Sequence, residues 1–375
     1  MSSEPTRTAT AAAFAFFVLL GGVTAALGAA LPVLRAEYGL AAGEGGSLIA
    51  CYSFGGFTAI ALCGLFAHRL PGPLVLRLSV VLFAAGCVGM GLADTWPVLV
   101  TAGAVTGLGY GGAVLHLNVA FAQRFDGVLM LNFLNAAFGA GTITGPLAVG
   151  WMPTITPAFP VIGVLALLCL PAGQAAPRHA PPPPSRHHLP AGLLAPFTLM
   201  VLLYAGLETG VGAWQATHLI SQGLPPDTAV HWVSAFWAAL ALGRIVIPLV
   251  TRTQPLHRVV VYCLAAATAA LAVATIPPLT PYAYTAAGLC LAPVIPVAVA
   301  WLTGRTPAAP QATAFLFAAS MAGSTTLPLL VGILATPPTP ALPIPLALTT
   351  IGAAALAAAL ATAHRHASPT PGFRR

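Results

Sequence analysis

The sequence predicts an all-α membrane protein with twelve transmembrane helices in two bundles of six and with both termini in the cytoplasm. Composition gives the class, because 58% of the residues are hydrophobic, only 6% are charged and the mean hydropathy is +0.90. A soluble domain has roughly 25% charged residues. Apolar runs of about 20 residues, long enough to cross a bilayer, recur along the chain, and the arginines give the orientation.

The first half of the chain holds six apolar runs. The first is too long, at about 25 residues, to be the apolar part of a signal peptide, which has about 7 to 15 residues, so we interpret it as a helix. The uncharged stretch 127–177 is too long for one helix, and its prolines divide it in two. The six predicted helices are Thr10–Leu34, Ser47–Ala67, Leu74–Leu92, Trp96–Ala122, Val128–Met152 and Phe159–Leu170.

The second half repeats this count after a proline-rich segment. That segment contains the tract Pro181–Pro184 with several arginines and histidines, and it is predicted to stay extended and solvated because it has little apolar surface to bury. It forms a cytoplasmic linker, 172–192, between an N-terminal bundle, 1–171, and a C-terminal bundle with a short cytoplasmic tail, 193–375. The later helices are Leu193–Ser221, Ala229–Thr251, Val259–Ile276, Pro281–Thr303, Gln311–Ala335 and Leu342–Ala363.

The arginines set the predicted orientation. The chain has no lysine, and a cytoplasmic N-terminus places twelve of its 14 arginines on the cytoplasmic side, leaving Arg35 outside and Arg244 within a helix. Such a bias is the usual positive-inside pattern. One missed or invented helix would reverse the side of every later loop, so the agreement supports the count of twelve.

Charge and cysteine usage exclude several functions. The net charge of +7 comes from arginines scattered one or two per loop, which mark topology and do not form a nucleic-acid surface. The six cysteines show no paired spacing, so we expect neither a disulfide nor a metal site. The sequence has no paired carboxylates and no P-loop. We therefore expect a protein that is not an enzyme, has no catalytic residues and no cofactor, and lies in a lipid bilayer.

The loop after the second predicted helix resembles a family motif. Residues 64–72 read GLFAHRLPG, and Arg77 follows. The stretch is similar to the major facilitator superfamily motif Gly-x-Leu-Ala-Asp-Arg-x-Gly-Arg, with His68 in place of the acid, and a degenerate echo, LVTR, ends at Arg252. In that family such arginines hold cytoplasmic helix ends together, although the missing acid weakens the inferred latch. The resemblance implies a gating role for Gly64, Arg69, Arg77, Arg244 and Arg252.

Three further segments look like the fucose-permease-like sugar transporters of this superfamily. They read LNFLNAAFG at 131–139, YAGLETGVGAWQ at 204–215 and FW at 236–237. The resemblance implies a monomeric secondary transporter that moves a small, sugar-like solute by alternating access at a midplane site. Fucose-type proton symporters rely on acids in the first and fourth helices, which are absent here. Proton coupling through Glu208, uniport and another substrate class all remain open.

A rival interpretation comes from glycines in the fifth predicted helix. Gly141, Gly145, Pro146 and Gly150 approximate the antiporter motif of drug-efflux members of the superfamily, with Val149 in place of one glycine. Small residues at this spacing also let helices pack closely. A drug or metabolite efflux antiporter is therefore the alternative function.

Glu208 is the first candidate site residue, because it is the one acid deep inside an apolar run. A carboxylate at that depth costs about 2.5 to 3.5 kcal/mol on insertion scales, which marks a functional site by default. Gln215 lies about 20° away on the same helix face, and Trp214 is close by. This set suits a polyol, with Glu208 binding hydroxyls and carrying a proton. The alternative is a structural pair with Arg244, which is doubtful because Arg244 lies nearer the cytoplasmic end of its helix.

The remaining candidates are polar or aromatic residues in three helices. His116 and Asn118 differ by about 200° and cannot face one cavity, and a histidine in helix packing is as good an explanation as a proton-responsive group. Asn132 and Asn135 either face the substrate or bond between helices. Trp237 either lines the cavity or faces lipid.

Two helices are predicted to move. Glycines between 107 and 112 in the fourth helix correspond by repeat to Pro293 and Pro296 in the tenth, and interrupted helices at matching positions mark cavity-lining elements. High Ala, Gly, Pro and Arg usage without lysine favours a bacterial gene and hence a multi-pass protein of the cell membrane. Substrate identity, direction of transport and coupling ion stay open at this level.

Overall fold

The computed structural model describes residues 7–41, 44–66, 71–122, 127–152, 154–175, 191–306, 309–335 and 342–366. Throughout these ranges the regular elements are helices. Ten helical segments among the described residues are long and apolar enough to cross a membrane. The prediction of an all-α membrane protein is thus confirmed by the helices and their lengths. The count of twelve transmembrane helices and the side of the membrane on which the termini lie stay predictions.

The helices of the first half follow the predicted runs to within a few residues. The predicted fourth helix coincides with α4, and the sixth is shorter and is followed by a 3₁₀ turn, η1. Proline and glycine at the predicted ends explain the agreement, because both residues terminate helices. The elements are α1 (Arg7–Tyr38), α2 (Gly46–Phe66), α3 (Gly72–Gly91), α4 (Trp96–Ala122), α5 (Gly127–Gly150), α6 (Ala158–Leu167) and η1 (Leu170–Ala175).

In the second half, the predicted tenth helix is two helices. The chain breaks between α10 and α11 at Pro293, because proline has no backbone N–H to donate and restricts the residue before it. The elements are α7 (Ala191–Ser221), α8 (Pro226–Val250), α9 (Leu256–Val273), η2 (Pro277–Leu279), α10 (Thr280–Leu291), α11 (Val294–Thr303), α12 (Ala309–Leu334) and α13 (Pro343–His366).

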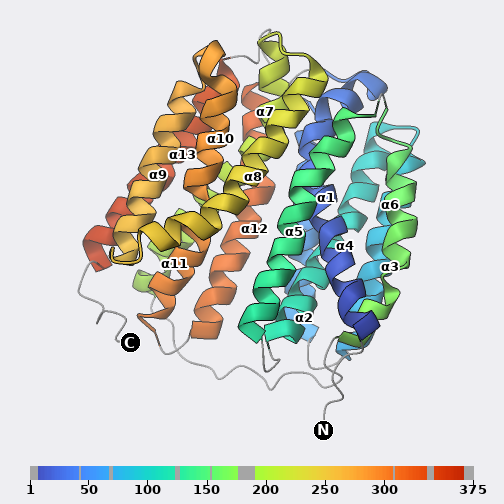
Figure 1. Ribbon diagram of the computed structural model, residues 1–375, viewed down its shortest axis with the longest axis horizontal. Coiled ribbons are helices and arrows are strands. Elements are labelled where there is room, and N and C mark those ends of the chain that lie inside the picture. The colour runs from blue at the N-terminus through green and yellow to red at the C-terminus, as the bar shows by residue number, and fades with distance from the viewer. Residues whose placement is uncertain are drawn as a thin grey trace.

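The described helices pack as two groups placed side by side (Figure 1). In the first group α1 packs on α5, and α4 packs on α2 and α3; in the second, α7 packs on α12 and α13, and α8 on α10. The groups meet where α1 contacts α7, α2 contacts α12 and α5 contacts α8. Since α1 begins and α13 ends on one side of the molecule, we call that side the terminal face and the other side the opposite face (Figure 1).

Glycines bring neighbouring helix backbones into direct contact. A Cβ atom built on Gly107 would lie 1.9 Å from the carbonyl oxygen of Tyr52, and one on Gly111 would lie 2.1 Å from that of Gly56. The glycines of α4 therefore serve close packing. The predicted interruption of the fourth helix is wrong, because α4 runs without a break, whereas the interruption of the tenth is confirmed.

The start of the predicted linker is also corrected. Residues 172–175 belong to η1, and Ala172 and Gly173 are buried, with η1 packed on α1 and α3. A Cβ atom on Gly173 would lie 2.6 Å from Cγ of Arg77, so this arginine covers the turn. Apolar alanines next to a helix end explain why these residues pack and do not extend into solvent. Residues 176–190 lie outside the described part of the chain.

Candidate functional site

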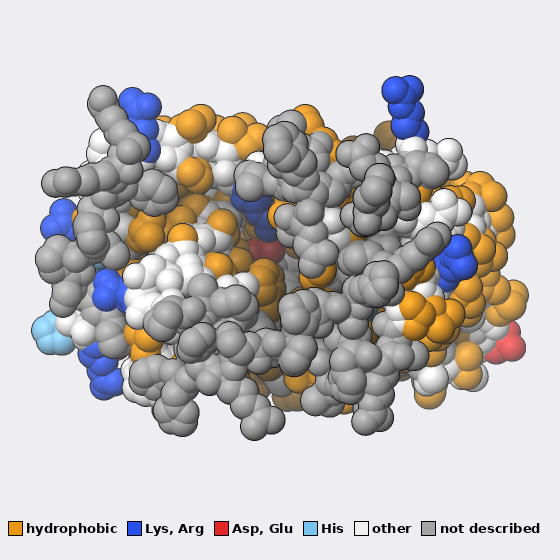
Figure 2. All heavy atoms as spheres, turned by 90° about the horizontal axis from the view of Figure 1, so that it is seen from below, with side chains coloured by type: hydrophobic (Ala, Val, Ile, Leu, Met, Phe, Trp, Pro, Cys, Tyr) orange, Lys and Arg blue, Asp and Glu red, His pale blue; other side chains and the backbone are white. Residues whose placement is uncertain are grey.

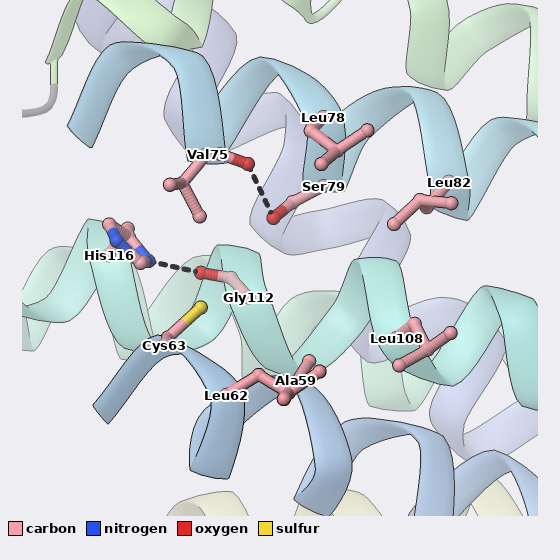
Figure 3. A pocket seen from close by; sticks show the side chains of 10 residues that line it. All are labelled: Ala59, Leu62, Cys63, Val75, Leu78, Ser79, Leu82, Leu108, Gly112 and His116. Carbon is pink, nitrogen blue, oxygen red and sulfur yellow. Dashed lines mark hydrogen bonds between the residues drawn. The ribbon is translucent and has the colours of Figure 1, made fainter. Parts of the chain in front are cut away.

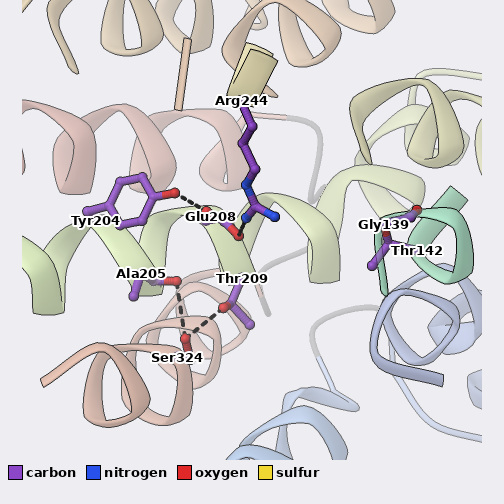
Figure 4. A network of polar contacts seen from close by, with 8 residues as sticks. All are labelled: Gly139, Thr142, Tyr204, Ala205, Glu208, Thr209, Arg244 and Ser324. Carbon is purple, nitrogen blue, oxygen red and sulfur yellow. Dashed lines mark hydrogen bonds and ion pairs between the residues drawn. The ribbon is translucent and has the colours of Figure 1, made fainter. Parts of the chain in front are cut away.

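Glu208 of α7 and Arg244 of α8 face each other across the boundary between their helices (Figure 4). Nη2 of Arg244 lies 4.0 Å from Oε1 of Glu208, and the side chains are 42% and 17% exposed respectively. The hydroxyl of Tyr204, one helical turn before Glu208, donates to the other carboxylate oxygen. On the sequence alone a pairing of Glu208 with Arg244 is doubtful, and the structure corrects that expectation. The sequence does not give the offset between two antiparallel helices, and the long arginine side chain bridges the remaining distance.

Hydroxyl groups tie the same stretch of α7 to α12. Thr209 donates to the Ser324 hydroxyl at 2.9 Å, and Ser324 donates to the carbonyl oxygen of Ala205 at 3.3 Å. Figure 4 shows this chain of contacts on the side of α7 away from Arg244. The polar face of α7 is therefore held in place by α8 on one side and by α12 on the other.

Aromatic and hydroxyl side chains of the first helix group lie near the pair of Glu208 and Arg244. Tyr110 of α4 lies close enough to Glu208 and Arg244 for both charges to act on its hydroxyl. Its ring centre lies 5.4 Å from that of Tyr52, whose hydroxyl is 2.8 Å from that of Thr24. A carboxylate, a guanidinium and several hydroxyls thus come together with aromatic rings, a combination that binds polar solutes.

A hollow between the two helix groups opens on the terminal face. Figure 2 looks at that face and shows acidic and basic atoms deep between the two groups of helices. Among the described acids, Glu208 is the one in the middle of a helix, whereas Glu37, Glu44, Asp94 and Asp227 lie near helix ends or in connections. Glu208 thus lies midway between the two faces, on a helix that borders the first group.

The opposite face is closed around Arg35. This residue, in the last turn of α1, donates to Thr217 of α7 at 2.6 Å and to the carbonyl oxygen of Glu44 at 3.2 Å. Its guanidinium carbon lies 5.6 Å from the ring centre of Trp214. Below it, a Cβ atom on Gly28 would lie 2.2 Å from the carbonyl oxygen of Gly212. The two groups are in contact here.

Trp214 belongs to this closed end. Its indole is fully buried and donates to the carbonyl oxygen of Pro328 in α12 at 2.8 Å. The ring also lies against Gly46 of α2. In this conformation the indole therefore packs between helices, and the expected stacking on a substrate stays a prediction.

Gln215 and Trp237 are buried between helices. Gln215 contacts α8, as Glu208 does, and donates to the carbonyl oxygen of Trp232 at 2.9 Å, while its Oε1 has no partner among the described residues. Trp237 is 8% exposed and packs on Gly212 of α7. The ring fills a helix contact that the sequence pattern does not locate, and the substrate-binding role expected for Trp237 stays a prediction.

His116 faces a different cavity from Glu208. A cavity of about 320 Å³ between α2, α3 and α4 is lined by His116, Cys63 and Ser79 together with aliphatic side chains (Figure 3). Nδ1 of His116 lies 2.9 Å from the carbonyl oxygen of Gly112. Asn118 donates to the carbonyl oxygen of Val114 within its own helix at 2.7 Å. The structure brings neither residue to the charged pair.

The asparagines of α5 and the loop arginines lie at exposed positions. Asn132 and Asn135 are exposed, and Asn135 donates to Leu131 of its own helix at 2.8 Å. Arg77 and Arg252 are exposed near helix ends. Gly64 is in α2, and Arg69 lies outside the described residues. The gating role of these residues stays a prediction.

Several residues near the site or the closed end were not among the predicted site residues. Tyr204 could have been found from its spacing of four residues before Glu208, which places both on one helix face. Tyr110, Ser324 and Thr209 carry no comparable signal, because tyrosine, serine and threonine are common in apolar helices. Arg35 could have been noticed as the one arginine expected outside.

A protein-family model matches most of this chain. The family model of the Major Facilitator Superfamily matches residues 12–287. Two uncharacterized MFS-type transporters of Mycobacterium tuberculosis, from strains CDC 1551 / Oshkosh and H37Rv, are each 32% identical over 151 residues, which is 38% of this chain. The matched region spans 21% of the length of these relatives.

Solved structures share the fold. The nucleoside transporter NupG is 14% identical, covers 95% of this chain and 98% of its own, and gives a TM-score of 0.74. The D-xylose-proton symporter is 16% identical, with 98% and 99% covered and a TM-score of 0.74. A variant of the Escherichia coli fucose:proton symporter FucP is 13% identical, with 94% and 98% covered and a TM-score of 0.62.

Proposed function

The chain belongs to the major facilitator superfamily and is a multi-pass membrane transporter, and from that premise we propose that it moves a small polar, sugar-like solute by alternating access. The observation that carries the proposal is the pair Glu208 and Arg244, which lies inside two apolar helices that border the first helix group. Charged side chains inside a membrane are retained where they serve a substrate or ion pathway.

The chemistry of the hollow supports a polar solute. Glu208, Arg244 and Tyr204 offer charged and neutral hydrogen-bonding groups, and Tyr110 adds an aromatic ring. A site for lipophilic compounds would present mainly apolar side chains. The structural neighbours named for nucleosides, D-xylose and fucose are compatible with this choice.

The efflux alternative has less support. A Cβ atom on Gly141 would lie 2.0 Å from the carbonyl oxygen of Val18, and one on Gly145 would lie 2.3 Å from that of Gly22. Close contact between α5 and α1 is thus sufficient to explain the glycines of the antiporter-like segment.

The closed end and the open hollow support alternating access. Contacts through Arg35, Gly28 and Trp214 close the opposite face, whereas the hollow reaches the terminal face. With the orientation indicated by the arginines, the terminal face is cytoplasmic and the conformation is inward-facing. We further infer that Glu208 carries the coupling proton, that Arg77 and Arg252 belong to the cytoplasmic gate, and that the protein acts as a monomer in a bacterial cell membrane.

A ligand screen tests the proposal. Thermal unfolding of the purified protein is followed with sugars and polyols and with lipophilic cations, because a bound ligand raises the midpoint. We expect a polar solute to stabilise the parent and Glu208→Gln to change that response, with Asp94→Asn as an exposed acid-to-amide control. Stabilisation by lipophilic cations alone would replace the proposal with the efflux alternative.

A further inference from the structure

Arg244 presents unused hydrogen-bond donors to the hollow, and from this we propose that the transported solute carries a carboxylate, which Arg244 binds while Glu208 takes up a proton. The inference rests on the proposed function, because it assumes that the hollow is the solute site. It narrows the solute class to small hydroxy-carboxylates. It also gives the two charged residues different tasks.

The guanidinium of Arg244 has free capacity for an anion. It is 42% exposed, and its ion-pair partner, Oε1 of Glu208, is 4.0 Å away, which is too long for a hydrogen bond. Among the described residues no other acceptor is bonded to it. A guanidinium has five N–H donors in a planar arrangement that fits a carboxylate through two parallel bonds. A carboxylate entering the hollow therefore meets matching donors.

The carboxylate of Glu208 is the poorer partner for a solute. One oxygen accepts the hydroxyl of Tyr204, and the other faces Arg244. The side chain is also less exposed than that of Arg244, at 17%. A cationic solute would have to compete with both existing partners, whereas an anionic solute has only to draw Arg244 away from a long contact. The geometry favours an anion.

Charge balance links the anion to a proton. The empty pair carries no net charge, so adding a carboxylate alone leaves one uncompensated negative charge in a region of low dielectric constant. A proton taken from solution onto Glu208 converts it into a neutral acid, and Arg244 then pairs with the solute. On the other side the proton leaves, Glu208 pairs with Arg244 again, and the carboxylate is displaced.

Few titratable groups face Glu208. Tyr204 comes from α7 itself, Arg244 from α8, and Tyr110 from α4 across the hollow. Helix α12 has no titratable residue, and the histidines and arginine of α13 lie in its last turn. Towards the opposite face, Arg35 bonds Thr217, and the Tyr284 hydroxyl of α10 lies 2.8 Å from Nδ1 of His218. Arg244 is thus the described cation that responds directly to the charge of Glu208.

Hydroxyls beside the pair favour a hydroxylated carboxylate. The Tyr204 hydroxyl bonds Glu208, and the Tyr110 hydroxyl lies close enough to Glu208 and Arg244 for both charges to act on it. Hydroxyl groups donate and accept, so they can bond the hydroxyls of a solute once its carboxylate is held by Arg244. The solute class is therefore a small acid with one or more hydroxyl groups.

The test compares acids with uncharged solutes of similar size. Lactate, glycerate and gluconate are added to the purified full chain against glycerol and sorbitol, and binding is followed by the shift in unfolding temperature. We expect an acid to bind the parent, and Arg244→Gln to bind it at least about tenfold more weakly, because a hydrogen bond to a charged group contributes about 1.5 to 3 kcal/mol. Arg365→Gln, at an exposed arginine in the last turn of α13, is the matched control.

Glu208→Gln separates the proposal from a structural role of the pair. The amide imitates the protonated acid and leaves Arg244 free, so we expect the acid to bind about twofold to fivefold more tightly near neutral pH, the gain from releasing a weak ion pair. Binding to this variant should also lose its dependence on pH. In vesicles with a trapped pH dye, the parent should acidify the lumen as the acid enters, and Glu208→Gln should not.

Each outcome of these experiments either supports or overturns the proposed carboxylate solute. Binding of the acids that requires Arg244, with a proton moved only when Glu208 is present, supports the proposal. Binding of glycerol or sorbitol but of none of the acids overturns the carboxylate while leaving the proposed function intact. Binding of lipophilic cations alone overturns both. Acids that bind Arg244→Gln as well as the parent, or no stabilisation by any of these solutes, overturn the proposal as well.

Discussion

Arg35, in the last turn of α1, donates a 2.6 Å hydrogen bond to the hydroxyl of Thr217 in α7, 182 residues away. The bond joins the two helix groups at the opposite face, and Arg35 is only 6% exposed. The same guanidinium covers the ring of Trp214. A buried cation with bonds to both groups therefore helps to hold this end closed, which makes it a point where the conformational balance can be changed.

Replacing Arg35 by alanine should open the opposite face. The change removes two hydrogen bonds from a charged donor, each contributing about 1.5 to 3 kcal/mol. Spin labels at the exposed residues Ala36 and Ser221, at the ends of α1 and α7, should show a longer distance in a variant without native cysteines. Arg365→Ala, at an exposed arginine near the end of α13, is the control. An unchanged distance would mean that Arg35 does not help to close this end.

Adding one methyl group at Gly28 should have a similar effect. A Cβ atom there would lie 2.2 Å from the carbonyl oxygen of Gly212, so Gly28→Ala forces α1 and α7 apart at a cost of about 1 to 3 kcal/mol. The same pair of labels should move apart. Gly192→Ala, where no heavy atom lies within 4 Å, should leave the distance as it is. The same label distance in Gly28→Ala and Gly192→Ala would contradict a close contact between Gly28 and Gly212.

Two glycines of α5 should respond in opposite ways to alanine. Gly145→Ala should lower stability by about 1 to 3 kcal/mol, since the new Cβ atom would meet the carbonyl oxygen of Gly22 at 2.3 Å. At Gly139 the nearest atom is the Cβ of Ala241 at 3.9 Å, and alanine should raise stability by up to about 1 kcal/mol through its helix propensity. Unfolding in mixed detergent measures both. A neutral Gly145→Ala would refute the packing role.

Trp214→Phe should reduce stability without changing solute affinity. Phenylalanine keeps a ring under Arg35 but cannot donate to the carbonyl oxygen of Pro328, and such a bond contributes about 1 kcal/mol. Detergent unfolding and the solute dissociation constant are measured on the same preparations. A clear loss of affinity at unchanged stability would show that the indole contacts solute in another conformation.

The pair of Glu208 and Arg244 should contribute little to folding. At 4.0 Å, and with the arginine 42% exposed, a double-mutant cycle with Glu208→Gln and Arg244→Gln should give a coupling energy below about 1 kcal/mol. The measurement is the free energy of unfolding of the two single variants, the double variant and the parent. A coupling of several kcal/mol would identify a structural ion pair.

The sequence was informative about helices and less so about their contacts. Hydropathy located Trp96–Ala122 to the residue, because proline, glycine and charged residues mark helix ends. Periodicity placed Glu208 and Gln215 on one face of α7, and both contact α8. The offset between helices is a tertiary property, so the pairing with Arg244 was misjudged. The burial of Trp214 has the same origin, since its neighbours come from distant parts of the chain.

The contact between Gly28 and Gly212 has a kinetic consequence. At this point backbone lies against backbone. The helices α1 and α7 can therefore separate here without withdrawing a side chain from between the side chains of the other helix. Interlocked side chains must change rotamer together when helices part, and tight packing resists such changes. The two glycine surfaces of α1 and α7 separate without such a rotamer change. The time needed to open this end is then governed by the bond of Arg35 to Thr217, which joins the two groups.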